Sequence, residues 1–197
     1  MYWDDARTTA TGHRSRSRRV ANSAARVQAE GLSETKQLQL EFWTGFRDYA
    51  DQHAERIRMT KPPARNWWRI SVGRPGFHLC AIANPMKDEL RAEFLITHEE
   101  SAALYEWFSA ERETLEREVG ERLEWNSADD VTMKRILLHR LADLEDRSAW
   151  PEYHRWLLAK LDKLDEVFRP RVQSLDVEAI VGSGRGHIDS LAGVVAK

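Results

Sequence analysis

The sequence contains a single cysteine, Cys80, among its 197 residues, which excludes an intrachain disulfide. Cys80 stands in an apolar run, where a small buried side chain is expected. No apolar run approaches the roughly 20 residues that a transmembrane helix needs. The opening residues, with Trp3, Asp4 and Asp5, lack the basic-then-apolar order of a signal peptide. We therefore expect a soluble protein of the reducing cytoplasm, without a membrane partner.

Motifs for catalysis or metal binding are also scarce. The seven histidines show no paired ligand spacing, and one cysteine cannot supply a zinc set. A restriction-type nuclease holds Mg²⁺ with carboxylates beside a lysine, yet only Glu34-Thr35-Lys36 and Asp162-Lys163 come near that order, both in predicted helices. The glycine-rich residues 182–186 lack the spacing of a phosphate-binding loop. The sequence therefore predicts no catalytic residue, no metal site and no cofactor.

Charge is strongly segregated, although the formal net charge is only −2. Residues 99–130 hold eleven acidic side chains against three arginines, whereas residues 56–87 hold seven basic side chains and no acidic one. Trp67 and Trp68 lie in the middle of this basic stretch. Cations neutralise phosphates and aromatic rings stack on bases, so the composition is typical of binding to single-stranded or irregular nucleic acid. The basic residues are Arg56, Arg58, Lys61, Arg65, Arg69, Arg74 and Lys87.

Hydrophobic periodicity predicts elements in the order α-β-β-β-α-β-β-α. Short turns between successive strands make them antiparallel, and each helix has one apolar stripe. We expect an α+β fold, in which a three-strand meander and a hairpin form an antiparallel sheet covered by helices on one face. The predicted helices cover residues 34–54, residues 99–119 and a segment that starts at Trp150. The predicted strands start at Trp67, cover 77–83, run from Leu90 to Ile96, include Leu123 and Trp125, and cover 133–140.

The expected helix ends and core follow from local signals. Thr97 with Glu100 predicts a capping box before the second helix, and Gly120 should terminate it. Pro170 should kink or end the last helix. The apolar stripes should meet in one core, whose predicted members are Phe42, Phe46, Trp68, Ile70, Leu79, Phe94, Leu104, Phe108, Trp156 and Leu164.

Domain limits follow from composition. Residues 1–32 are rich in Arg, Ser, Thr and Ala without apolar periodicity, which predicts a flexible basic N-terminal tail or linker. Residues 33–174 hold every predicted element and should form a single α+β domain. Residues 175–197 are expected to form a weakly ordered C-terminal tail.

Four separated blocks carry a family resemblance. They are ETKQLQLEFW at 34–43, SVGRPGFHL at 71–79, WPE at 150–152 and VFRPR at 167–171. In this order, over about residues 33–174, they resemble the family catalogued as domain of unknown function 4268. That domain commonly sits C-terminal to a restriction-nuclease-like domain, so the resemblance implies nuclease-associated DNA or RNA biology. It brings no established catalytic residues, and only residues 1–32 stand here where the nuclease domain would be.

The candidate nucleic-acid interface comprises Arg58, Lys61, Arg65, Trp67, Arg69 and Arg74. Trp68 is in phase with the apolar side of its strand and is expected in the core. Trp67 shares the side of Arg69, so a ligand contact and a place at the core edge both stay open for it. In the alternative interpretation, Arg69 pairs with Glu93 across the sheet and the other cations are merely solvated. The acidic helix at 99–119 would repel phosphate, so nucleic acid should approach the basic side only.

These observations suggest a non-catalytic, nucleic-acid-associated accessory module of a nuclease or defence system. Its expected partners are DNA or RNA and a nuclease chain. The alternative is a protein-interaction module, in which the aromatic helix at 34–54 and the opposed charge patches drive oligomerisation or docking to a separate nuclease chain. An enzyme is the third hypothesis.

Overall fold

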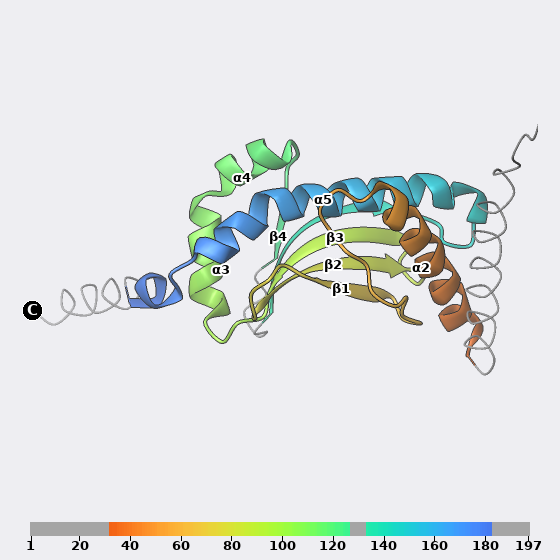
Figure 1. The fold of residues 1–197 in the computed structure, drawn as a ribbon, viewed down its shortest axis with the longest axis horizontal. Helices are drawn as coiled ribbons and strands as arrows, with labels where there is room; N and C mark the ends of the chain where they lie inside the picture. The colour runs from red at the N-terminus through yellow and green to blue at the C-terminus, as the bar shows by residue number, and fades with distance from the viewer. Residues whose placement is uncertain (1–31, 127–132, 183–197) are drawn as a thin grey trace, which may run out of the picture.

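The structure, a computed structural model, describes residues 32–126 and 133–182 (Figure 1). The predicted tail at 1–32 and the glycine-rich residues 182–186 lie almost wholly outside these ranges. The helices are α2 (Glu34–His53), α3 (Ser101–Ala110), α4 (Arg112–Val119) and α5 (Trp150–Ser174), with a short 3₁₀ helix η1 (Arg147–Ala149). The strands are β1 (Trp67–Ser71), β2 (Phe77–Asn84), β3 (Glu89–Ile96), β4 (Glu124–Asn126) and β5 (Lys134–Leu141). None of the described helices has the length and apolar character that crossing a membrane requires.

The strands form one antiparallel sheet in the order β1-β2-β3-β5-β4. β1, β2 and β3 form the predicted meander, and β5 lies between β3 and β4. The register places Ile70 opposite Leu79 and Leu79 opposite Phe94, so one apolar face continues from strand to strand. The predicted α+β fold with its antiparallel sheet is therefore confirmed.

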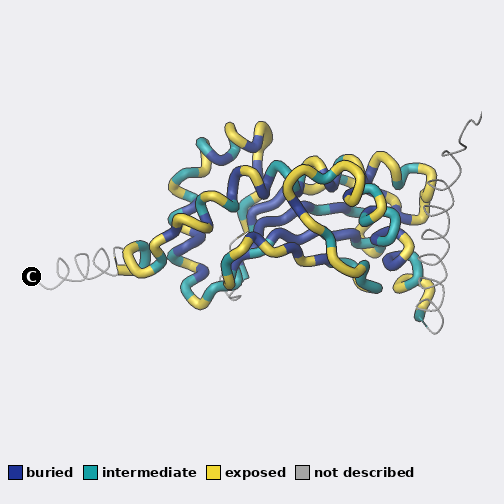
Figure 2. Tube along the Cα trace, viewed as in Figure 1, coloured by how far each residue is buried: buried dark blue, intermediate teal, exposed yellow. Residues whose placement is uncertain are grey.

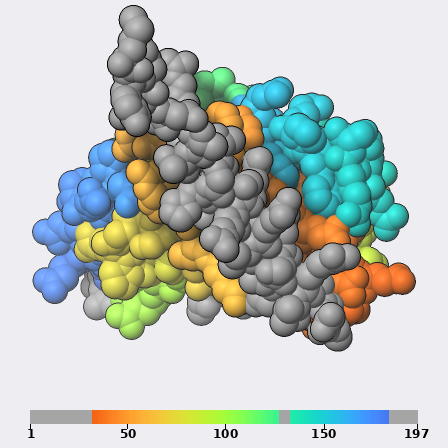
Figure 3. Space-filling model, turned by 45° about the vertical axis from the view of Figure 1, so that its right-hand side comes forward, coloured from red at the N-terminus to blue at the C-terminus, as the bar shows by residue number. Residues whose placement is uncertain are grey.

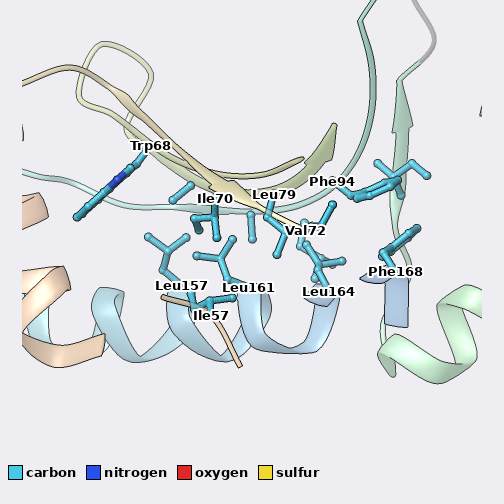
Figure 4. Packing of buried hydrophobic residues seen from close by; sticks show 14 of the residues in the cluster. Ile57, Trp68, Ile70, Val72, Leu79, Phe94, Leu157, Leu161, Leu164 and Phe168 are labelled. Carbon is cyan, nitrogen blue, oxygen red and sulfur yellow. The ribbon is translucent and has the colours of Figure 1, made fainter. Parts of the chain in front are cut away.

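The core lies between this apolar face and α5, which runs across the sheet (Figure 1). In the close-up, side chains of β1 and β2 point towards Leu157, Leu161 and Leu164 of α5 (Figure 4). The ring centroids of Phe94 and Phe168 lie 4.3 Å apart in a stacked pair. Buried residues accordingly concentrate in the strands and along the inner side of the helices (Figure 2). Every predicted core residue is buried except Trp156, which packs half-buried against the margin of the core.

The second predicted helix is interrupted. It consists of α3 and α4, which meet at Glu111, where φ is −98° and ψ is 12°. The carboxylates of Glu111 and Glu118 both bind Arg171 of α5, at 3.3 and 2.9 Å. This tertiary contact stabilises the interruption between α3 and α4. The spacing of apolar residues in the sequence does not indicate it. The predicted capping box is also wrong, because Glu100 is the N-cap residue and its backbone N–H binds Nδ1 of His98 at 3.1 Å.

Pro170 does not end α5, which continues to Ser174. Proline inside a helix removes one backbone hydrogen bond and costs about 3 kcal/mol. Phe168 and Val172, on either side of Pro170, are completely buried, whereas Pro170 itself is exposed. Burial of the flanking side chains therefore offsets the missing bond. Beyond α5, residues 177–182 form a helical turn, and Oδ1 of Asp176 accepts the N–H of Ala179 at 3.0 Å.

His154 of α5 is a buried titratable group in the contact between α5 and α2. Its ring lies 4.7 Å from that of Phe42 and 5.8 Å from that of Phe46, measured between centroids. Gly45 of α2 makes this approach possible, because a Cβ at that position would come within 2.8 Å of Cε1 of His154. Nε2 is buried without a hydrogen-bond partner within the described ranges. Burial lowers the pKa of His154 to about 4, although a hydrogen bond to the Phe42 backbone opposes the shift.

This burial predicts a specific acid sensitivity. The folded protein keeps His154 neutral down to about pH 4, whereas the unfolded chain protonates it below about pH 6.5. The unfolded state binds more protons in that window, so stability falls as the pH falls. Relative to His154→Gln, the wild type should lose about 3 kcal/mol of unfolding free energy between pH 7 and pH 4. Urea melts of both proteins across this range measure the difference; parallel profiles would contradict it.

Candidate nucleic-acid interface

The loop between α2 and β1, residues 54–66, carries much of the basic stretch and is fixed at three points. Asp162 of α5 accepts the backbone N–H groups of Glu55, Arg56 and Ile57, each at 3.1 Å. In the middle of the loop, the hydroxyl of Thr60 accepts Nε1–H of Trp68 at 3.1 Å. At its end, the carbonyl of Arg65 accepts Nε1–H of Trp43 at 2.7 Å. The loop therefore has a defined shape, although it contains no helix or strand.

The acid-free stretch finds its counter-ions on α5. Asp165, whose side chain is only 1% exposed, lies 3.3 Å from Nε of Arg56 and 2.6 Å from Nη2 of Arg169. Arg169 also donates to the carbonyl of Ser71 at the end of β1, at 3.2 Å. A buried carboxylate must be paired to be tolerated, and these arginines supply the pairing. In the space-filling view, the orange and yellow surface of this loop and the first strands adjoins the blue end of α5 (Figure 3). Arg56 is thus part of the fold.

Arg74, at the tip of the β1–β2 hairpin, also binds α5. Gly73 and Gly76 beside it have φ of 87° and 85°, which the tight turn requires. One guanidinium nitrogen of Arg74 donates to the carbonyls of Val172 and Leu175, at 3.0 and 2.6 Å. These carbonyls lie at the C-terminal end of α5, where a cation is favoured by the helix dipole. The structure therefore separates Arg74 from the other candidate residues.

The remaining cations of the candidate site are exposed, and two of them, Arg65 and Arg69, lie over the ring of Trp67. Arg58, Lys61, Arg65 and Arg69 form no ion pair with an acidic residue of the described segments. Nη1 of Arg58 donates to the carbonyl of Ile57 at 3.2 Å, and Nε of Arg65 donates to that of Trp67 at 3.3 Å. Both contacts leave part of each guanidinium available. These four cations and Trp67 are called the basic patch below.

Trp67 contacts both the cations and an apolar cluster. The guanidinium carbon of Arg65 lies 3.4 Å from its ring centroid, and that of Arg69 lies at 5.5 Å. Its ring also packs against a small apolar cluster on the sheet face opposite the core. Trp67 is accordingly half-buried. It therefore covers one side of this apolar cluster, and its ring carries the guanidinium group of Arg65.

The outer sheet face next to the patch is electrostatically compensated. The alternative interpretation, in which Arg69 pairs with Glu93, is wrong, since Glu93 binds Arg91 and Arg135 at 3.1 and 3.9 Å. Arg69 lies opposite Cys80 of β2, which separates it from Glu93. Burial raises the pKa of Glu93, and the two arginine charges oppose that rise. The carboxylate is therefore enclosed by its own cations, and it leaves the charge of Arg69 unpaired.

Two further groups on this face are uncharged at neutral pH. Burial and the charge of Arg69 lower the pKa of His78. Burial, together with Glu93, raises the pKa of Cys80 to about 12, so its thiol stays protonated and is a poor nucleophile.

The acidic helix α4 lies near β4, at the opposite sheet edge from β1 (Figure 1). The basic patch is thus separated from the acidic part of the chain.

The other sequence candidates do not assemble into a site. Glu34 and Lys36 lie exposed in the first turn of α2, and Asp162 is engaged with the loop. Within the described ranges, no three His, Cys, Asp or Glu side chains come together as metal ligands could. Phe42, Trp43 and Phe46 of α2 are completely buried. The aromatic side of this helix therefore serves the core, and it is not free to dock a partner.

The engagement of Arg74 predicts that its role is structural. Arg74→Ala removes two charge-assisted hydrogen bonds at the end of α5 and should lower the unfolding free energy by about 1 to 2 kcal/mol. Arg58→Ala, in the same stretch but exposed, should change it by less than about 0.5 kcal/mol. Denaturant melts of the two variants provide the comparison, and equal losses would contradict the assignment of Arg74 to the fold.

The chain was compared with known families, curated proteins and solved structures. The model of the family described as "Domain of unknown function (DUF4268)" matches residues 38–172. No curated protein and no solved structure matched. The matched residues run from α2 into the last turn of α5, and they include the whole sheet, the loop at 54–66 and the basic patch. Because this match covers more than half of the chain, the protein belongs to the DUF4268 family.

Proposed function

We propose that the protein is a nucleic-acid-binding accessory module without chemistry of its own, and that the basic patch is its binding surface. One observation carries the proposal. Arg56, Arg91 and Arg135 are paired with acids, and Arg74 caps a helix, whereas the four cations of the basic patch are exposed and have no described acidic partner. A fold that neutralises most of its neighbouring arginines and leaves one group unpaired presents a local positive surface for a polyanion.

The chemistry of the patch favours nucleic acid over an acidic protein. Arg65 stacks on Trp67 as a flat cation, so its outer face offers a stacking surface to an unpaired base. Arg58 and Lys61 are carried on the same pinned loop and can neutralise neighbouring phosphates. A base and its flanking phosphates use both properties at once. An acidic peptide would use only the charge.

The wider role follows from the family resemblance and is part of the proposal. Since the resembling domains commonly accompany restriction-nuclease-like domains, this module would hold DNA or RNA for a nuclease carried by another domain or chain. The rival protein-interaction hypothesis relied on the aromatic side of α2. Phe42, Trp43 and Phe46 lie in the core, so that hypothesis retains only the charge patches.

Salt dependence tests the proposal. If the four cations neutralise phosphates, the logarithm of the binding constant for a single-stranded oligonucleotide should fall with log salt at a slope of about −3. Arg58→Ala with Lys61→Ala should flatten this slope by about 1.4. The matched control removes Arg117 and Arg122, two exposed cations near the acidic end, and should leave the slope unchanged. Fluorescence anisotropy at several salt concentrations measures all three. Absence of binding at low salt would refute the proposal.

The stacked pair makes a separate prediction. Trp67→Ala should remove about 1 to 3 kcal/mol of binding free energy with the salt slope unchanged, because stacking is lost while every cation remains. Arg65→Lys should also weaken binding at constant slope, since lysine keeps the charge but lacks the planar group. Arg58→Lys is the control, because no aromatic ring is found beside Arg58 within the described residues. The same titrations apply, and equal effects of the two lysine variants would contradict a stacking role for Arg65.

A further inference from the structure

We infer that Asp162 is a positioning residue for nucleic-acid binding, which holds the loop at 54–66 in the shape that presents the basic patch. The inference rests on the proposed function and assigns to it an acidic residue on another element. Asp162 belongs to α5, and the N–H groups that it binds lie more than 100 positions earlier in the chain.

The contact has the geometry of a clamp. Oδ1 of Asp162 accepts the N–H groups of Arg56 and Ile57, and Oδ2 accepts that of Glu55, all at 3.1 Å. Consecutive backbone N–H groups that converge on one anion form a concave site of high affinity for a carboxylate. Because the acceptor is charged, these bonds are stronger than those between neutral groups. The backbone is therefore fixed immediately before the first free cation, Arg58.

The side chain of Ile57 completes the clamp. It is 1% exposed and inserts beside Leu157 and Leu161 of α5 (Figure 4). With Ile57 directed inward and its N–H bound by Asp162, Arg58 starts from a fixed backbone position at the surface. The bond from Trp43 to the Arg65 carbonyl fixes the other end of the loop. Binding to an ordered loop avoids the entropy loss of arranging long side chains and backbone around the ligand.

Two physical effects of Asp162 on binding have opposite signs, which makes the inference testable. As a negative charge close to the basic loop, Asp162 repels phosphate, so its neutralisation would tighten binding if only charge mattered. As a clamp, Asp162 orders the loop, so its removal would weaken binding. The sign of the change therefore identifies which effect dominates.

The experiment compares Asp162→Ala, Asp162→Asn and a matched control, Glu166→Gln, by anisotropy with a labelled single-stranded oligonucleotide. Glu166 is exposed on α5 and lines the same pocket as Asp162, and its hydrogen-bond partner is Lys163 of the same helix, so the control removes an equal charge nearby without removing a bond to the loop backbone. Asp162→Ala should weaken binding about tenfold, as expected when one or two long side chains must be ordered on binding. Asp162→Asn keeps one acceptor oxygen and should lie in between. Glu166→Gln should bind as wild type or slightly tighter.

Two further measurements separate positioning from general destabilisation. Hydrogen exchange should accelerate at the amides of residues 55–57 in the Asp162 variants and stay unchanged in the core strands. The salt slope should become shallower by about one unit in Asp162→Ala, since a released loop engages fewer cations at once. If Asp162→Ala does not fold, Asp162→Asn carries the test. If a folded Asp162 variant shows faster exchange in the loop and still binds as tightly as the wild type, or more tightly, that result overturns the inference and leaves the proposed function standing. No binding by the wild type overturns the proposed function and the inference together.

Discussion

Two of the carboxylates of α5, those of Asp162 and Asp165, are the constraint on which the arrangement of the basic stretch depends. Asp162 holds the backbone at the start of the loop, and Asp165 pairs with Arg56 and Arg169 in a buried position. The seven cations of this stretch repel one another, and the stretch itself contains no acidic residue that could offset the repulsion. The negative partners come from an element about 100 residues later, and they neutralise only part of the stretch. Among the cations without a described acidic partner, Arg58, Lys61, Arg65 and Arg69 belong to the basic patch.

The fold was largely predictable because most elements have one strongly apolar side. The helical stripe through Phe42 and Phe46 and the alternation around Trp68 and Ile70 each bury one face, so period alone indicates both the element and the core. The errors arose where a tertiary contact overrides the local pattern. Arg171 binds Glu111 at the break between α3 and α4, and it also binds Glu118 within α4. Completely buried neighbours let α5 continue through Pro170.

The candidate site was predictable as a region but not residue by residue. Composition identifies the concentration of cations, yet it cannot distinguish Arg74, which binds carbonyls of α5, from Arg58, which is exposed. Asp162 left no sequence signal, because its partners are backbone N–H groups, which every residue except proline carries. Asp165 did leave one. Asp165 lies one helical turn after Leu161, on the side of α5 that the apolar residues predict to be buried. A buried carboxylate needs a cationic partner, so its position indicates an ion pair.

The edge strand β1 bears on the choice between the proposed anion binding and the addition of another β-strand. β1 is one of the two edge strands of the sheet, and an exposed edge is open to pairing with a further chain. The carbonyl of Trp67 accepts from Arg65 and that of Ser71 accepts from Arg169, so internal side chains already occupy acceptors that an added strand would need. Arg65 also places positive charge at this edge, whereas the charge of Arg169 is paired with Asp165. A strand added at this edge would therefore meet guanidinium groups at these two positions instead of free backbone acceptors, which supports the proposed anion binding over strand addition.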